Sequence, residues 1–406
     1  MAEILPFAAL RYDTAKYKLE DVLTQPYDKI TPAMQEKYSA RHPDNLIAIE
    51  KGQTLPDDSP ADNVYTRAAA ALQDWVARRV LVQESAPAIY AYFQDYRAPG
   101  SAERKERQCF IALGRVQDYS AGVVHRHEQT LAGPRADRLE LLRHTRTHTG
   151  QLFMMYSDAT HAVDALLEEA ARRPATAEVR DEYDVRHRLW TMSDPARITE
   201  IQRLMRDKKL VIADGHHRYE TALAYRNEQR AATGNSAPDA PHEKVMMTFI
   251  NTHYEGLLIL PTHRVVANLA NFDPASLRGR LAAWFEITVH EDSGAGRIAR
   301  FRDELVLRGL RARVMGLYAG GQCSFLTLRS AANLDALLAQ VGALQRQLDV
   351  VLLHRLVLEK GLGITPDAVS VEQTVAMALA GEVLPQKSTD FYPKLLSGLA
   401  IYRLGG

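Results

Sequence analysis

Apolar and polar positions follow two different periods along the chain, and these periods predict helices and strands. In residues 62–76, apolar side chains recur three and four positions apart, which predicts a helix that Asp62 can cap. Shorter apolar runs bounded by turn residues predict strands. Two such runs, 89–93 and 109–113, flank a polar stretch, and we expect them to pair antiparallel.

The middle of the chain continues with alternating helices and strands. Asp194-Pro195 supplies an N-cap and a proline at the first helical position, which predicts a helix that ends near residue 208. An apolar run at 210–213 then predicts a strand, and 217–230 predicts a helix. The other expected elements are helices at 161–172, from Asp273-Pro274 and at 348–361, strands at 188–191 and 285–290, a strand pair of 245–250 and 257–260, and a hairpin of 314–318 and 325–328. This alternation indicates an α+β (mixed α/β) fold.

The length of the chain and one polar stretch indicate how it divides. At about 100–200 residues per domain, we expect two or three domains. Residues 231–242 carry Gly, Asn, Ser, Pro and Asp, which is typical of an exposed loop. We therefore predict an N-terminal α/β region, 1–240, and a C-terminal α/β region, 241–406, with 268–273 as a second candidate boundary.

The composition excludes several classes of protein. The 50 basic and 50 acidic residues cancel, and no local basic patch would attract nucleic acid. No apolar run approaches the ~18 residues that span a bilayer, and the N-terminus lacks the features of a signal peptide. The two cysteines, Cys109 and Cys323, form no Cys-x-x-Cys motif, which excludes a disulfide framework and a cysteine-rich zinc site. We expect a cytoplasmic protein with neither a membrane nor a nucleic acid as partner.

The strongest chemical signal is a turn between a predicted strand and a predicted helix. Gly215 permits a positive φ and lets a ligand approach the backbone, and the amide N–H groups of the helix start attract anions. Arg218 adds a forked donor for phosphate oxygens, and His216 and His217 can donate hydrogen bonds or carry protons. Asp214 can cap the helix or hold Mg²⁺. The turn predicts a phosphate site; the alternative is an ordinary strand–helix connection in which Asp214 is only a cap.

A second cluster, residues 125–138, is dense in His, Arg, Glu and Asp. Side chains of these types suit proton transfer and phosphate contacts, and the candidates are His127, Glu128 and Arg138. The spacing of His125 and His127 also allows metal binding, although a third ligand at a standard spacing is missing. The alternative is a charged surface loop.

A third candidate lies near the C-terminus, where Lys387 is followed by Ser388 and Thr389. Lys-Ser-Thr is similar to the end of a P-loop, but the glycines that precede it in a Walker A motif are missing. Lys387 can still approach a phosphate, and an ordered loop with surface charges is the alternative.

Motifs spread over nearly the whole chain resemble one known family. They are Pro6–Tyr12, Pro26–Asp28, Arg41–Asn45, His127–Leu131, Gly133–Leu139, Asp214–Ala222, Leu260–Arg264 and Pro385–Lys394. By these motifs the chain is identified as a member of the domain-of-unknown-function family numbered one thousand and fifteen, which has no assigned activity. Between residues 362–364 and 380–382 the chain is shorter than the family's pattern.

The Asp-Gly-His-His-Arg turn resembles, more distantly, the phosphate-binding turn of the ParB/sulfiredoxin superfamily. This superfamily includes CTP-binding ParB proteins, sulfiredoxin and a free serine kinase, and the resemblance implies a ParB/sulfiredoxin-like core with additional α/β domains. Gly215, His217 and Arg218 match the phosphate-binding positions of the turn. His216 stands where sulfiredoxin has its reactive cysteine, so the resemblance speaks against sulfiredoxin chemistry and favours the serine kinase.

These signals together predict a nucleotide-dependent phosphotransferase that acts on a small hydroxylated metabolite with ATP, ADP or CTP and Mg²⁺. The expected phosphate or nucleotide ligands are Asp214, Gly215, His216, His217, Arg218, Arg138 and Lys387. The expected groups for proton transfer are Glu128, His127 and His216, with Asp214 also as the Mg²⁺ ligand.

Two other functions remain open. One is a non-catalytic nucleotide sensor of the ParB type, in which binding changes the arrangement of the domains. The other is a metal-dependent hydrolase built from His125, His127, His216 and His217. Detection of a product formed from a nucleotide would separate the enzyme from the sensor.

Overall fold

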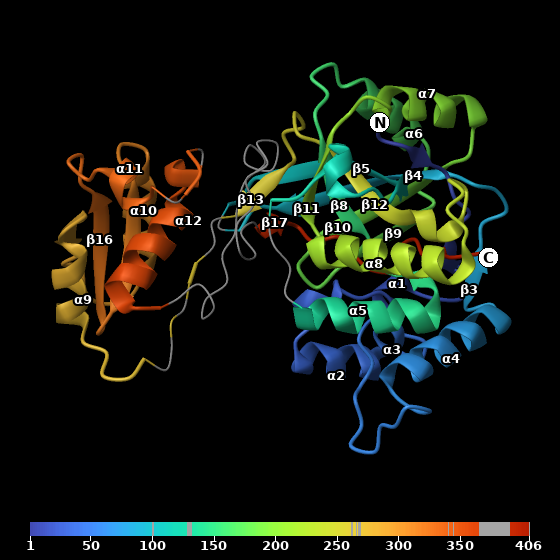
Figure 1. Ribbon diagram of the computed structural model, residues 1–406, viewed down its shortest axis with the longest axis horizontal. Helices are drawn as coiled ribbons and strands as arrows, with labels where there is room; N and C mark the ends of the chain where they lie inside the picture. Colours follow the sequence, from blue (N-terminus) through green and yellow to red (C-terminus); the bar gives the residue numbers. More distant parts are fainter. Residues whose placement is uncertain are drawn as a thin grey trace. The chain divides into compact units, whose positions relative to one another are not determined.

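The computed structural model describes residues 1–99, 101–127, 132–260, 263–264, 266, 269–339, 341–343, 345–364 and 390–405. Unit 1, the larger of two compact units, holds the described residues of 1–126, 132–260 and 390–405 (Figure 1). Unit 2 holds His127 and the described residues of 263–364. The expected boundary near 240 differs from this division, because the strand at Lys244–Asn251 lies in the sheet of unit 1 and the C-terminal residues return to unit 1.

Unit 1 is built on a large mixed sheet. Its strands are β1 (Ile4–Leu5), β4 (Ile89–Arg97), β5 (Arg104–Arg115), β6 (Val124–His125), β8 (Leu152–Tyr156), β9 (Ala177–Arg180), β10 (Arg186–Met192), β11 (Leu210–Asp214) and β12 (Lys244–Asn251). The strand order is β6-β11-β8-β12-β5-β4-β10-β9, and β1 pairs with β5. β4 and β5 are antiparallel, with Tyr90 opposite Ile111, which confirms the predicted pair.

The helices of unit 1 are α1 (Leu19–Val22), α2 (Pro32–Arg41), α3 (Ile47–Glu50), α4 (Val64–Ala77), α5 (Ala132–Thr145), α6 (Ala162–Ala171), α7 (Pro195–Met205) and α8 (His216–Thr233). Four of them, α4, α6, α7 and α8, lie at predicted positions, whereas α1, α2 and α3 were not predicted. Asp194 caps α7 as predicted. The predicted cap of α4 is wrong: Asn63, not Asp62, accepts from the first-turn amides, and Thr66 completes a capping box.

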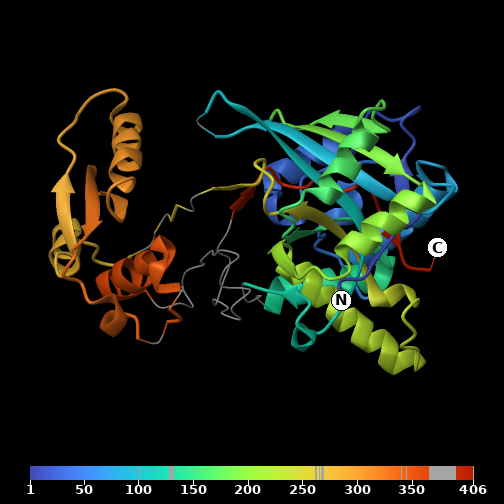
Figure 2. The same ribbon diagram turned by 90° about the horizontal axis from the view of Figure 1, so that it is seen from above.

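The two faces of the sheet differ in chemistry. On one face, alternate apolar side chains such as Ile89, Ala91 and Phe93 of β4 form the main core with α6, α7 and α8. Figure 2 shows the strands and helices of this unit from a second direction. On the other face, β4 presents Tyr92 and Gln94, which are buried and bond the backbone of the C-terminal segment. α5 packs along α8, and α4 packs along α5. The C-terminal segment therefore lies on the polar face, beside the start of α8.

Three small two-stranded sheets complete unit 1. β2 (Leu10–Tyr12) pairs with β3 (Leu81–Gln83), β7 (Thr147–His148) pairs with β18 (Tyr402–Arg403), and β13 (Leu258–Leu260) pairs with β17 (Asp390–Tyr392). The predicted pairing of 245–250 with 257–260 is therefore wrong. β12 instead lies between β5 and β8, because its side chains from Val245 onward are buried on both faces, as in an inner strand.

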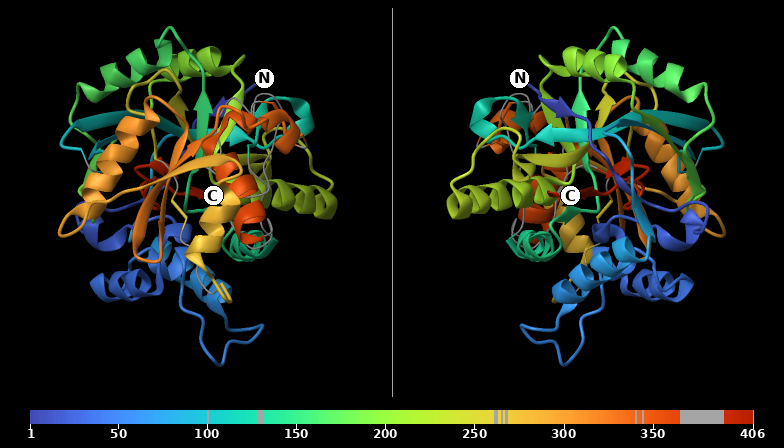
Figure 3. Two further views of the ribbon diagram at one scale, coloured as in Figure 1. Left: turned by 90° about the vertical axis from the view of Figure 1, so that its left-hand side faces the viewer. Right: turned by 90° about the vertical axis from the view of Figure 1, so that its right-hand side faces the viewer.

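Unit 2 is a three-stranded antiparallel sheet covered by helices (Figure 3). The strands β14 (Phe285–Val289), β15 (Val314–Ala319) and β16 (Gln322–Leu328) have the order β14-β16-β15, and the hairpin of β15 and β16 confirms the prediction. The helices are α9 (Pro274–Leu281), α10 (Arg297–Gly309), α11 (Leu334–Leu337) and α12 (Asp349–Leu352), and α12 continues as a π-helix over Leu353–Gly361. The fold is thus mixed α+β, as predicted. Among the described residues, every helix is too short or too polar to span a bilayer.

Candidate functional site

The predicted strand–turn–helix is present at the end of β11. Gly215 has a φ of +92°, and a Cβ at this position would lie 3.1 Å from Leu152 Cδ2, so the turn requires glycine. The Gly215 N–H donates to Asp214 Oδ1 at 2.8 Å. Since the N-cap residue is glycine, no side-chain cap bonds the first turn of the 18-residue helix α8. The turn therefore has the backbone geometry that favours anions at a helix N-terminus.

A lysine from the far end of the chain lies against this turn. Lys394 Nζ donates to Asp214 Oδ2 at 2.7 Å and lies 2.9 Å from Asp390 Oδ1. Lys29 Nζ donates to the same Asp390 oxygen at 3.4 Å. Two ammonium groups and two carboxylates therefore form one chain of ion pairs. Sequence spacing gives no sign of this contact; only the family motif that ends at Lys394 marks the residue.

Arg218 is held by the protein itself. Its Nη1 donates to the backbone oxygen of Gln151 at 2.9 Å, and its Nη2 donates to Glu50 Oε1 at 3.3 Å. A Cβ at Gly150 would lie 2.9 Å from the guanidinium carbon, so the chain passes close against it. Burial disfavours the cation, but Glu50 together with Asp28, Tyr27 and Asp214 outweighs it, and the pKa of Arg218 is raised. Arg218 thus stays charged at the first turn of α8.

Glu50 is a site residue that the sequence does not reveal. It ends α3, is 2% exposed, and accepts hydrogen bonds from Thr149 Oγ1 and, at 3.3 Å, from Ser397 Oγ. A buried carboxylate is rare unless it is paired and hydrogen-bonded, as Glu50 is here. Through these contacts Glu50 links three segments of unit 1: α3, the loop between β7 and β8, and the C-terminal segment.

The ring of Tyr27 lies close to two arginines, Arg138 and Arg218. The guanidinium carbon of Arg138 is 4.3 Å from the centre of the ring, and that of Arg218 is 5.1 Å from it. Arg138 Nη1 also donates to the backbone oxygen of Glu50 at 2.8 Å. Of the residues predicted at the site, Arg138 therefore does meet Arg218, through Tyr27 and Glu50. The neighbour of Tyr27, Asp28, is exposed on the same 3-10 turn.

A cavity of about 40 Å³ lies beside these side chains, with Glu50, Arg138, His148 and Arg218 in its wall. This volume suits one water molecule rather than a nucleotide. Desolvation, with the charge of Arg218, lowers the pKa of His148 to about 4. His148 is therefore neutral at pH 7, and the cations of this wall are the two arginines.

The remaining predicted residues are distributed unevenly. His216 is buried and His217 is half-buried at the start of α8. His125 lies on β6 opposite Val211 of β11. His127 belongs to unit 2, and Glu128 and Lys387 lie outside the described residues. That His127, Glu128 and Lys387 lie close to the Asp214–Arg218 turn stays a prediction. Within the described ranges, no three His, Cys, Asp or Glu side chains lie close enough together to hold a metal ion.

Two buried polar side chains, Arg107 and Gln94, bond the backbone around Lys394. Arg107 is fully buried, and its guanidinium donates to Gln94 Oε1 and to the backbone oxygens of Tyr392 and Pro393. Gln94 Nε2 in turn donates to the backbone oxygen of Lys394 at 2.8 Å. Burial lowers the pKa of Arg107. Because this arginine bonds carbonyl oxygens directly before Lys394, it fixes the course of the segment that carries the lysine.

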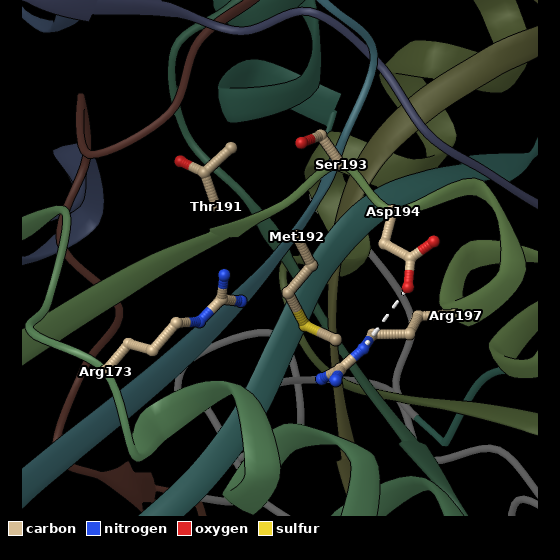
Figure 4. Close-up of a pocket in the computed structure, with 6 residues that line it drawn as sticks. All are labelled: Arg173, Thr191, Met192, Ser193, Asp194 and Arg197. Atoms are coloured by element: carbon tan, nitrogen blue, oxygen red, sulfur yellow. Dashed lines mark ion pairs between the residues drawn. The ribbon is translucent and has the colours of Figure 1, made fainter.

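A larger hollow of about 300 Å³ lies elsewhere on unit 1, where β10 ends and α7 begins. Figure 4 shows its lining, with Arg173 and Arg197 on either side of Met192 and with Ser193 above them. Arg197 Nε is 3.4 Å from Asp194 Oδ2, so part of its charge is neutralised within the hollow. None of the residues that line this hollow belongs to the group around Asp214, Arg218 and Lys394.

The sequence profile of one protein family matches most of the chain, residues 4–351. The chain belongs to this family, whose description is protein of unknown function (DUF1015). No curated protein matches the chain, and no solved structure matches it. The likeness of the Asp214–Arg218 turn to the ParB/sulfiredoxin superfamily therefore stays a prediction from sequence.

Proposed function

We propose that this DUF1015 protein is a nucleotide-dependent phosphotransferase whose phosphates bind between the start of α8 and Lys394. The observation that supports it best is the ammonium group of Lys394, 2.7 Å from Asp214 at a glycine-capped helix start. An ammonium group, first-turn amides and a helix dipole all favour the same ligand, a phosphate. No single one of them would suffice, but they come together here from segments 180 positions apart.

Each group has a proposed role. The first-turn amides after Gly215 and the ammonium of Lys394 would bind phosphate oxygens. Two N–H groups of Arg218 are bonded to Glu50 and Gln151, which leaves other donors of its guanidinium for a phosphate. His217 would add a hydrogen bond, and Arg138 and Lys387 would add charge.

Magnesium fits the carboxylates beside Lys394. Mg²⁺ is usually held by one or two carboxylates together with phosphate oxygens, so a dedicated cage of protein ligands is not required. Asp214 and Asp390 both reach the same ammonium, at 2.7 and 2.9 Å, so their oxygens converge on one place. Asp214, with Asp390 beside it, would hold the ion, which would neutralise charge on the transferred phosphoryl group.

In the proposed reaction, the acceptor's hydroxyl oxygen forms a bond to the terminal phosphorus and the bond to the bridging oxygen breaks. The nucleotide leaves with one phosphate fewer. The hydroxyl proton passes to a carboxylate, for which we propose Glu128, with His127 or His216 assisting. Glu50 is less suited to this role, because its oxygens already accept from Thr149, Ser397 and Arg218.

The test is product formation. The wild-type protein would be incubated with ATP, ADP or CTP, Mg²⁺ and pools of small hydroxylated metabolites, and new phosphate esters would be detected by ³¹P NMR. We expect an ester with one nucleotide and acceptor class. We expect Glu128→Gln to bind that nucleotide but to form at least about 100-fold less ester, as for loss of a general base. Nucleotide binding without any ester would instead support the ParB-type sensor.

A further inference from the structure

The hollow of about 300 Å³ between β10 and α7 is not used by the proposed phosphotransferase (Figure 4). Small-molecule sites usually have volumes of about 300–1,000 Å³, so this hollow lies at the small end of that range, which suits a small metabolite. Its wall combines residues from three neighbouring stretches of unit 1. They are Arg173 after α6, Thr191 and Met192 of β10, Ser193 and Asp194 before α7, and Arg197 of α7.

The charged side chains in the wall of the hollow do not balance. Arg197 is paired twice: its Nη2 donates to Glu169 Oε1 at 2.5 Å, and its Nε lies 3.4 Å from Asp194 Oδ2. Arg173, in contrast, has no ion-pair partner among the described residues. The wall therefore holds two guanidinium groups and one carboxylate, and the charge of Arg173 is available to a ligand.

Hydrogen-bond donors and an apolar surface meet in the hollow. A guanidinium has five N–H groups, and the contacts of Arg197 with its two carboxylates involve Nη2 and Nε, which leaves Nη1. Figure 4 shows Arg173 and Arg197 on either side of Met192, with Ser193 above them. Guanidinium groups are the donors that best match the paired oxygens of a carboxylate or a phosphate, and the Met192 side chain offers an apolar surface between them.

The backbone around the hollow is fixed by the rest of unit 1. Trp190 Nε1 donates to the backbone oxygen of Arg173 at 2.8 Å, and Trp190 and Met192 belong to the main core. Asp194 is held as the N-cap of α7, where its Oδ1 accepts from the Ala196 N–H at 3.1 Å. The backbone of the wall is thus preformed, so a ligand would not have to order it.

We propose that this hollow binds a small metabolite through an oxyanionic group, a carboxylate or a phosphate monoester, placed between the guanidinium groups of Arg173 and Arg197. Arg173 supplies the charge that no protein group neutralises, and Arg197 supplies its remaining donors. Asp194 opposes the ligand, because it is a like charge in the same wall. This is a second site, and it does not depend on the proposed phosphotransferase activity.

The test is isothermal titration calorimetry of the full chain with glycerol 3-phosphate and, separately, with succinate. We expect the wild type to bind at least one of them, and the probe that binds more tightly identifies the oxyanion. Arg173→Met should raise the Kd at least about tenfold, because it removes the unpaired guanidinium. Arg172→Met is the matched control: Arg172 is exposed and is not among the residues that line the hollow, so its loss should leave the Kd unchanged.

Two further variants test the charge of the wall and the identity of the site. Asp194→Asn removes the opposing carboxylate but keeps a good N-cap for α7, so the Kd should fall several-fold. Lys394→Met should leave the Kd unchanged, since Lys394 belongs to the site proposed at the start of α8 and not to this hollow.

Three results would overturn the proposal. They are a wild type that binds neither probe, a Kd that Arg173→Met changes no more than Arg172→Met does, and a Kd that rises in Asp194→Asn. Binding that is lost in Lys394→Met and kept in Arg173→Met would also overturn it, because the probes would then bind at α8. The substituted arginines and Asp194 are at least partly exposed, so the variants should fold, and thermal unfolding of each variant checks this.

Discussion

Two ion pairs flank the start of α8, and they differ in how firmly the protein holds them. Arg218 and Glu50 are surrounded: Gln151 accepts from the arginine, and Thr149 and Ser397 donate to the carboxylate. Lys394 and Asp214 are linked instead to a chain of further charges, Asp390 and Lys29, that leads towards solvent. The Arg218–Glu50 pair has the features of a structural ion pair. The Lys394–Asp214 pair has the features of a site where a ligand can replace a protein charge. The comparison therefore distinguishes a pair whose loss mainly lowers stability from a pair that a ligand can displace.

A large effect on stability is expected at the Arg218–Glu50 pair. Glu50→Ala leaves the Arg218 guanidinium without its carboxylate partner, and breaking a buried pair in this way costs about 3–5 kcal/mol. Urea unfolding of the full chain would measure the loss. Glu178→Ala is the matched control, because it removes the partner of Arg186 from an exposed pair and should cost at most about 1 kcal/mol. Equal losses in both variants would remove the distinction between the two pairs.

An effect of at least similar size is expected at Arg107, which bonds the backbone beside Lys394. Arg107→Met leaves Gln94 and the backbone oxygens of Tyr392 and Pro393 without their donor, at about 1–3 kcal/mol for each buried group left unsatisfied. Because these groups lie next to Lys394, amide hydrogen exchange should rise in residues 391–397 before it rises elsewhere. Arg115→Met on the same strand, where Arg115 pairs with Glu3 near the surface, is the control. Unchanged exchange in 391–397 would contradict the role of Arg107 in fixing the segment.

The pH dependence of stability tests His148, which lies beside the Arg218–Glu50 pair. His148 has a pKa of about 4 in the folded protein, against about 6.5 in an unfolded chain. Between these values the unfolded chain binds the proton more readily, so stability is complete above about pH 6.5 and is lost as the pH falls towards 4. At 1.36 kcal/mol per pKa unit, the difference between about 6.5 and about 4 corresponds to a loss of about 3 kcal/mol. His148→Asn should reduce the loss between pH 6.5 and 4; an identical pH profile would show that another group is responsible.

The smallest effect on stability is expected at the Lys394–Asp214 pair. Lys394→Met leaves Asp214 with the Gly215 N–H and leaves Asp390 with Lys29, so the loss should stay near 1 kcal/mol. Urea unfolding beside Glu50→Ala would measure the difference. A loss as large as that of Glu50→Ala would mean that Lys394 is structural, and the proposed exchange with a phosphate would lose its basis.

The helices, the strands and two pairs of strands adjacent in sequence were predictable from local patterns, whereas pairings between distant segments were not. The period of apolar positions and the Asp194-Pro195 start give the helices and strands, because these signals act within a few residues. The pairing of 257–260 with 390–392 depends on where distant segments meet, and the sequence carries no local sign of it. In the same way, Gly215 marks the turn through its positive φ, whereas Glu50 and Lys394 reach the turn only through tertiary contacts.

The measurement that tests the central claim most directly is thermal unfolding with ATP, ADP, CTP, GTP and pyrophosphate, each with Mg²⁺. The proteins would be the wild type, Lys394→Met and Lys208→Met, a control that removes a lysine paired with Asp158 at 3.2 Å. At about 100 times its Kd, a ligand adds about 2.7 kcal/mol, which raises the Tm by a few degrees. We predict this shift with one nucleotide in the wild type and in Lys208→Met, and its loss in Lys394→Met. A shift of the same size in Lys394→Met, or no shift with any of the five ligands, would contradict a phosphate site at Lys394.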